Sequence, residues 1–149
     1  MYTPHTVTLY NAITDTETLE LTYNITLLSG VFLDIGKGSN IQKTGLADAD
    51  SAKLYIPFDV DATDAITGEP KVYIEPKLFR KLPDKTGFWT LETGGTSSGV
   101  DCFFAKGEVV SDKGIRDLKK QYDYVFDVST VDLRDFGSQR MQHWQVGGK

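Results

Sequence analysis

A regular alternation of apolar and polar residues over residues 19–27, LELTYNITL, is the feature that most constrains how this chain can fold. The odd-numbered positions are apolar and the even-numbered positions are polar. Because side chains alternate between the two faces of a β-strand, this segment predicts a strand with one buried and one solvated face. We expect it to pair antiparallel with HTVTLY (5–10) or with VFLDI (31–35), which lies beyond a break at Ser29-Gly30.

Further short strands are predicted along the rest of the chain. They are LYIPF (54–58), KVYIEP (71–76), GFWTLE (87–92), CFFAKGEVV (102–110) and YDYVFDVSTVDL (122–133). Pro57 has no backbone N–H to donate, so the strand that contains it is expected at a sheet edge or at a bulge. Many short strands separated by glycine-rich turns are typical of a β-barrel or a β-sandwich.

Helical patterns are few. SDKGIRDLKKQY (111–122) predicts one short helix, with Ser111 as the candidate N-cap and lysines in the last turn. EPKLFRKLP (75–83) predicts a single turn at most. Residues 36–51 are expected to form a loop that is longer than ordinary hairpin connections. The predicted fold class is therefore mainly β: one domain over residues 1–149, a small β-barrel or sandwich with one short helix and a long loop.

Composition excludes several classes of protein. The net charge of -5 disfavours a protein that wraps nucleic acid, because such proteins need a basic surface. The single cysteine, Cys102, cannot form an internal disulfide. The opening MYTPHTVTLY does not have the pattern of a signal peptide, and no apolar run approaches the roughly 20 residues that a membrane helix needs. We therefore expect no membrane partner.

Three short motifs resemble functional sites but lack the partners that those sites need. Asp135-Phe136-Gly137 matches a kinase triplet, but no glycine-rich loop, strand lysine or catalytic loop precedes it. DVDATD (59–64) resembles the start of a calcium loop without its glycine and its final glutamate. GKGSN (36–40) has the wrong spacing for a phosphate-binding loop.

The chain also offers few residues for nucleophilic or metal chemistry. His5 and His143 lie at opposite ends of the sequence, and neither can be paired with Cys102 from spacing alone. We predict that the protein is not an enzyme, with no catalytic residues, no metal and no cofactor.

The segment 136–149 carries large apolar groups almost to the end of the sequence. It is expected either to form a final strand within its own fold or to contact a partner, for example by adding a strand to a neighbouring subunit. The candidate interface residues are Phe136, Met141, His143, Trp144 and Val146. Gly147 and Gly148 are interpreted as a flexible exit that is compatible with either arrangement.

Four stretches carry a resemblance to a known family. They are YTPHTVTLYN (2–11), NIQKTGLADADSAKLYIPF (40–58), YIEPKLFRKLPDKTGFWTLETG (73–94) and DFGSQRMQHWQVGGK (135–149). Together they resemble an uncharacterised family of phage and prophage virion proteins of Gram-positive bacteria, encoded in the head-tail connection region. A second resemblance, in the pattern of strands and loops, is to the head-closure or stopper proteins of tailed phages.

The resemblance implies a structural component of the virion neck, assembled in the host cytoplasm. It implies a homo-oligomeric ring of six or twelve copies between the portal-adaptor proteins above and the tail terminator or tail proteins below. Genomic DNA would pass through the channel without sequence-specific binding. The long loop, with Gly36, Lys37, Gly38, Asn40 and Lys43, would then face the channel or the next ring and become ordered on assembly.

Two alternatives to this function stay open. One is a tail terminator or a tail-tube-like ring protein, since these are also small and rich in β-structure. The other is an oligonucleotide-binding-type β-barrel, for which the basic residues Lys113, Arg116, Lys119 and Lys120 are the best candidates.

Overall fold

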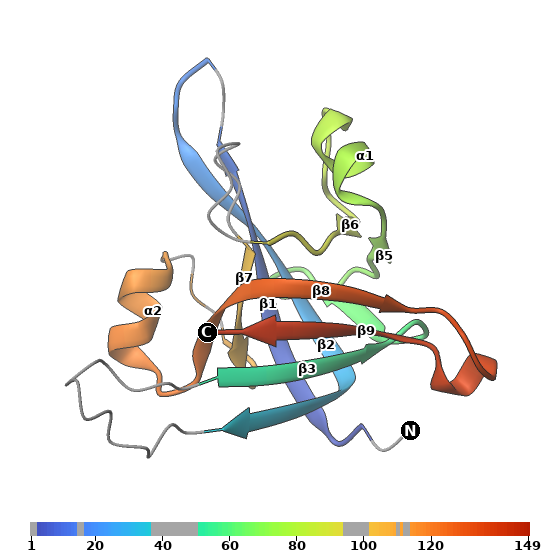
Figure 1. The fold of residues 1–149 in the computed structure, drawn as a ribbon. Coiled ribbons are helices and arrows are strands. Elements are labelled where there is room, and N and C mark those ends of the chain that lie inside the picture. Colours follow the sequence, from blue (N-terminus) through green and yellow to red (C-terminus); the bar gives the residue numbers. More distant parts are fainter. Residues whose placement is uncertain (1–2, 15–16, 37–50, 94–101, 110, 112–113) are drawn as a thin grey trace.

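The computed structural model describes residues 3–14, 17–36, 51–93, 102–109, 111 and 114–149 (Figure 1). Its elements follow one another as β1 (His5–Thr14), β2 (Leu21–Gly36), β3 (Ser51–Pro57), β4 (Asp61–Asp64), β5 (Val72–Tyr73), α1 (Pro76–Lys81), β6 (Phe88–Trp89), β7 (Cys102–Lys106), α2 (Ile115–Gln121), β8 (Val125–Arg134), the 3-10 turn η1 (Gln139–Met141) and β9 (His143–Gly148). The predicted mainly-β class is confirmed.

The main sheet closes into a barrel of six strands in the order β1, β7, β8, β9, β3 and β2, and the β1–β2 pairing completes the circle. Every pairing in the barrel is antiparallel. The barrel is filled by apolar side chains that alternate along the strands, among them Leu9, Leu54, Phe104 and Val146. Of the two architectures that the sequence allowed, the barrel is therefore the one observed.

Strand β2 is longer than predicted, because LELTYNITL and VFLDI belong to one continuous strand of 16 residues. Its first part pairs with β1, as expected, and residues 32–36 pair with β3. Gly30, at the change of partner, has a φ of 88°, a conformation that side chains disfavour. The predicted break at Ser29-Gly30 is thus a bend in a continuous strand. At this bend β2 changes its partner from β1 to β3.

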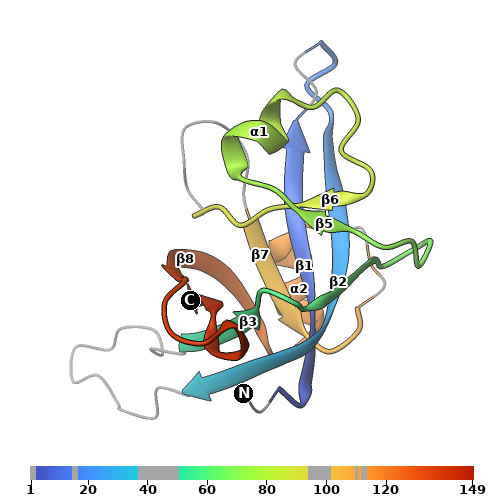
Figure 2. The same ribbon diagram turned by 90° about the vertical axis from the view of Figure 1, so that its right-hand side faces the viewer.

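The polar face of residues 19–27 was expected to be solvated; this holds for Glu20 and Thr22 but is wrong for Asn24 and Thr26, which are covered. The opposite face was expected to be buried, and this is wrong for Leu19 and Leu21, which are exposed. Figure 2 shows the segment β5–α1–β6 crossing β1 and β2 at the end of the barrel nearest their connecting hairpin. Asn24 Nδ2 donates to the carbonyl of Phe88 at 2.7 Å, and Asn11 Nδ2 donates to the carbonyl of Thr90 at 3.0 Å. The inward polar side chains therefore hold this segment, which we call the capping segment (residues 71–92), over the barrel end.

Lys71 anchors the start of the capping segment. Its ammonium group is fully buried and donates to Asn24 Oδ1 at 2.7 Å, to the carbonyl of Ile25 at 3.1 Å and to Thr26 Oγ1 at 3.1 Å. The carboxylate of Asp64 lies 3.5 Å from the same nitrogen. All three protons of the ammonium group find acceptors, which offsets the large cost of burying a charge.

The predicted helix is present as α2 and packs on the outer face of the barrel. Its buried residue Leu118 packs with Tyr10, Ile25 and Phe103 in a second apolar cluster, separate from the barrel interior. The expected N-cap was wrong: the helix begins at Ile115, Gly114 is its cap, and no side chain bonds the first turn. The single turn expected in EPKLFRKLP is a six-residue helix, α1, which begins at Pro76 because proline fits the first position of a helix.

Strand β9 lies between β3 and β8 and is paired along both edges. Trp144, on its inward face, packs in an aromatic cluster with Phe58, Tyr73 and Trp89 at ring-centroid distances of 4.6, 4.3 and 5.7 Å. Pro57, expected at a sheet edge, is the last residue of β3, a strand with a partner on each side. The β2 partner ends opposite Tyr55, so the missing N–H of Pro57 falls beyond that ladder.

The interpretation of Gly147 and Gly148 as a flexible exit is wrong, because both belong to β9. A Cβ atom on Gly148 would lie 2.8 Å from Phe126 Cβ and 2.9 Å from Phe104 Cζ, closer than real Cβ atoms approach their neighbours. A Cβ on Gly147 would collide with Thr130 Oγ1. Close packing against β8 thus explains why two glycines occur in a paired strand.

We expect Gly148→Ala to lower the free energy of unfolding by about 1–3 kcal/mol, because the added methyl group overpacks the barrel against Phe126 and Phe104. Urea denaturation followed by tryptophan fluorescence measures the change. Gly36→Ala is the matched control, since its Cβ would meet only Ser51 at ordinary distance. Equal stabilities of the two variants would contradict the close-packing explanation.

We also expect a pH-dependent contribution from Asp64. Burial would raise the pKa of its carboxyl, but N–H donors from Thr67 and Ile66 and the charge of Lys71 outweigh it and lower the pKa below 3.8. A folded-state pKa below the unfolded value gives stability that is present above pH 3.8 and is lost as the pH falls through the folded-state value.

Asp64→Asn should therefore destabilise the protein at pH 6 and cost less as the pH falls below about 4. Urea denaturation at pH 6 and pH 3 measures both costs, with Asp59→Asn at an exposed position as the control. A cost that stays the same or grows at low pH would contradict the assignment.

Candidate functional site

The fold buries some of the residues predicted to form an interface and leaves others exposed. Val146 is fully buried in the barrel and Trp144 is only 8% exposed. His143 is partly buried, and its ring lies 5.7 Å from that of Tyr55. Both edges of β9 are occupied within its own barrel, so this strand is not free to add to a neighbour's sheet.

Phe136 and Met141 remain accessible. They lie in the connection between β8 and β9, which includes η1, and they are 68% and 52% exposed. Their role as contact residues stays a prediction. Of the residues assigned to the channel loop, Gly36 ends β2 and is exposed, whereas Lys37, Gly38, Asn40 and Lys43 lie outside the described residues.

A groove that the sequence did not indicate lies between α1 and β8. It has a volume of about 340 Å³ and is lined by Pro76, Lys77, Arg80, Leu91, Glu92, Thr93 and Val131. We call it the α1–β8 groove. Its exposed lining is predominantly apolar with a few charged groups, a composition typical of binding pockets, and its volume is near the lower end of their range.

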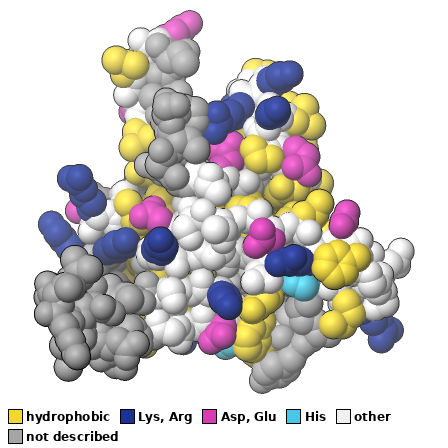
Figure 3. Space-filling model, viewed as in Figure 1, with side chains coloured by type: hydrophobic (Ala, Val, Ile, Leu, Met, Phe, Trp, Pro, Cys, Tyr) yellow, Lys and Arg dark blue, Asp and Glu magenta, His cyan; other side chains and the backbone are white. Residues whose placement is uncertain are grey.

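Helix α1 supplies one wall of the groove through Pro76, Lys77 and Arg80, which share one side of the helix. Phe79, on an adjacent side of α1, is buried and holds the helix to the protein. Basic side chains gather over α1 in Figure 3, and two of them, Arg80 and Lys81, lie in its last turn. The wall of the groove is therefore firmly attached, and it carries Lys77 together with Arg80, whose charge is offset by Glu92.

An ion pair fixes the back of the groove. Arg80 Nε and Nη2 donate to the two carboxylate oxygens of Glu92 at 2.9 and 3.0 Å, and the side chain of Glu92 is only 4% exposed. The carboxylate raises the pKa of the Arg80 guanidinium, so the pair stays charged. A two-bond geometry of this kind ties α1 to the segment that follows β6.

The edge of β8 borders the groove. This strand pairs with β7 only at Val125–Asp127 and with β9 from Val128 to Arg134. Within the part of the chain that the structure describes, no strand pairs with the second edge of residues 128–134. Alternate backbone N–H and C=O groups along such an edge can receive another strand.

The titratable residues considered from the sequence lie apart. Burial raises the pKa of the Cys102 thiol to about 12, so this thiol is unreactive near neutral pH. The acidic stretch 59–64 includes Asp64, which is engaged by Lys71 and by the N–H groups of Ile66 and Thr67. Across the described ranges, no group of three or more His, Cys, Asp or Glu residues is arranged to hold a metal ion.

None of the helices in the described parts of the chain is long and apolar enough to cross a membrane.

Sequence reasoning missed the groove because its lining comes from segments up to 55 positions apart, Pro76 and Val131. The available signal was EPKLFRKLP, with a proline at a helix start and basic residues on one face. What the pattern could not supply is the position of that helix opposite β8.

Comparison with known proteins gives one match. A family model, described as a family of unknown function (DUF6751), matches residues 2–149. No curated protein matches the chain. No solved structure matches it either.

We expect Arg80→Met to lower the free energy of unfolding by about 2–3 kcal/mol, because it leaves the nearly buried carboxylate of Glu92 unpaired. Lys77→Met, on the same side of α1, should change stability by less than about 0.5 kcal/mol. The double variant Arg80→Met with Glu92→Leu should recover most of the loss, since it removes both charges. Chemical denaturation tests all three, and a loss from Lys77→Met as large as that from Arg80→Met would contradict the role of the pair.

Proposed function

This chain belongs to the DUF6751 family, and we propose that it is a structural ring subunit of a phage virion neck, a head-closure protein between the portal-adaptor complex and the tail. The virion assignment rests on the resemblance of residues 2–11, 40–58, 73–94 and 135–149 to virion proteins of the head-tail connection region.

The observation that best supports a ring subunit is a pair of separate surfaces that the fold leaves uncovered. One is the tip of the β1–β2 hairpin, with Leu19 and Leu21 exposed, which projects away from the barrel (Figure 1). The other is the α1–β8 groove beside the unpaired edge of β8. A subunit that joins identical neighbours around a ring needs two different surfaces, because each contact is heterologous.

Net charge is consistent with a channel that DNA crosses. A protein with a net charge of -5 neutralises few phosphates, so DNA can move past it without being held tightly.

The oligonucleotide-binding alternative depends on α2, where Arg116, Lys119 and Lys120 are exposed. Lys119 lies 3.8 Å from Asp127, which reduces the charge available to a ligand. The nearby aromatic rings of Tyr10 and Phe103 are buried beneath the helix, whereas single-stranded nucleic acids stack on accessible rings. This alternative is therefore less well supported than the ring subunit.

The proposed function predicts that the chain is present in purified particles of the phage or induced prophage that encodes it. Quantitative mass spectrometry should find it in a multiple of six copies per particle, and antibody labelling should place it at the head-tail junction. Particles that contain none of it would overturn the proposal.

Deleting the gene separates the two ring roles. Loss of a head-closure protein should give heads that have released their DNA, together with unattached tails of normal length. Loss of a tail terminator should instead give filled heads and tails of irregular length, which would favour the alternative.

A further inference from the structure

The tip of the β1–β2 hairpin, residues 17–21, exposes an apolar side chain on a strained backbone. Leu19 is 78% exposed and has a φ of 58°, in the left-handed region that bulky residues rarely adopt. The exposed side chain and the left-handed backbone of Leu19 each raise the free energy of this tip conformation in the isolated chain. Residues held in such conformations tend to occur at functional sites.

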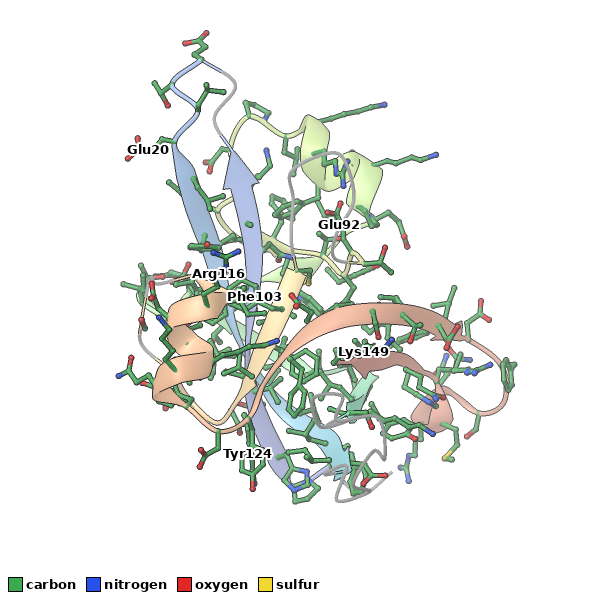
Figure 4. The ribbon with its side chains drawn as sticks, turned by 60° about the vertical axis from the view of Figure 1, so that its left-hand side comes forward. Glu20, Glu92, Phe103, Arg116, Tyr124 and Lys149 are labelled. Carbon is green, nitrogen blue, oxygen red and sulfur yellow. The ribbon has the colours of Figure 1, made fainter. Side chains whose placement is uncertain are left out.

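The charges of the tip and of the α1–β8 groove are opposite. Glu17 and Glu20 are both exposed beside Leu19. Figure 4 shows Glu20 near the hairpin tip and Glu92 apart from it, next to α1. The lining of the groove includes Lys77 and also Arg80, whose charge is offset by its pair with Glu92. An acidic tip with an apolar centre thus meets a groove whose exposed lining is mostly apolar and whose charged residues leave an excess of one positive charge, that of Lys77.

We infer that the hairpin tip of one copy docks in the α1–β8 groove of the next copy, with Leu19 over Leu91 and Val131 and Glu20 beside Lys77. This inference rests on the proposed function, because it assigns the surfaces that join subunits of the ring. The partner is a second copy of this chain, since the chain itself supplies both complementary surfaces.

The arrangement of the two surfaces makes the contact intermolecular. The hairpin tip projects past α1 and points away from β8, which forms the other wall of the groove (Figures 1 and 2). A tip cannot reach the groove of its own chain while β1 and β2 remain paired in the barrel. Each copy would therefore give its tip to one neighbour and receive the tip of another, an arrangement that closes into a ring when the rotation per contact allows it.

The two parts of the contact have different roles. Burial of Leu19 supplies affinity, as apolar anchors in central pockets do. The charged rim orients the tip and makes association faster at low salt than at high salt. The unpaired edge of β8 lies beside the groove, and Leu133, two residues beyond Val131, extends the apolar surface along the same strand face.

The first test measures self-association of the full chain by sedimentation velocity over a range of concentrations. Leu19→Asn should weaken association by about 30-fold or more, the effect of losing an interface anchor. Asparagine tolerates the left-handed backbone, so the melting temperature should not fall. Ile66→Asn is the matched control, because Ile66 is 73% exposed on a different part of the surface.

The second test reverses the charges. Glu20→Lys and Lys77→Glu should each weaken association when studied alone, because each places like charges together. Mixing the two variants should restore it, since a lysine tip then meets a glutamate groove, and the remaining contacts in an alternating ring are native. Only contact between the tip of one copy and the groove of another predicts this rescue.

Association that Leu19→Asn leaves unchanged, or charge variants that mixing does not rescue, would overturn the docking inference. So would a native chain that stays monomeric at the highest soluble concentration. None of these results decides whether the chain is a virion protein, because its presence in purified particles is measured separately. Conversely, tip-in-groove association of a chain that is absent from particles would support the docking and overturn the neck function.

Discussion

The insertion of β9 between β3 and β8 is the constraint on which the rest of the structure depends. Without this strand, nothing would pair β8 with β3, and the barrel would stay open between them. The strand fits because Gly147 and Gly148 allow its backbone to approach Thr130 and Phe126 closely. It also brings Trp144 to the aromatic cluster with Tyr73 and Trp89, so closure of the barrel and attachment of the capping segment depend on the same element.

The capping segment converts polar positions of β1 and β2 into structural contacts. Asn11 and Asn24 donate hydrogen bonds to its backbone. The ammonium group of Lys71 donates its three protons to acceptors of β2. Such contacts stabilise modestly on balance but fix a unique position, because a displaced segment would leave buried polar groups unpaired. The fixed position matters for function, since it places α1 opposite β8 and so creates the groove that we propose receives a neighbouring copy.

The two surfaces proposed for assembly differ in how the fold presents them. The groove is held in place by the Arg80–Glu92 pair and by buried Phe79, whereas the hairpin tip extends beyond the strands that flank it. A preformed groove lowers the entropy that association must overcome, and a projecting tip can enter it without rearrangement of the barrel. Such a division suits a ring in which every subunit makes the same two contacts.

The sequence by itself determined the class of the fold and most of its strands. The alternation in residues 19–27, and the shorter patterns after it, are local consequences of the two-residue period of a strand, and β1, β2, β3, β7 and β8 all follow from them. The helix α2 was also found in this way, although its cap at Gly114 was not. The tertiary structure alone decided that the polar face of β2 is covered at Asn24 and Thr26, that residues 143–148 close the barrel, and that α1 and β8 enclose a groove. The physical reason is the same in each case: alternation gives the faces of a strand, but which segment covers a face depends on contacts between residues distant in sequence.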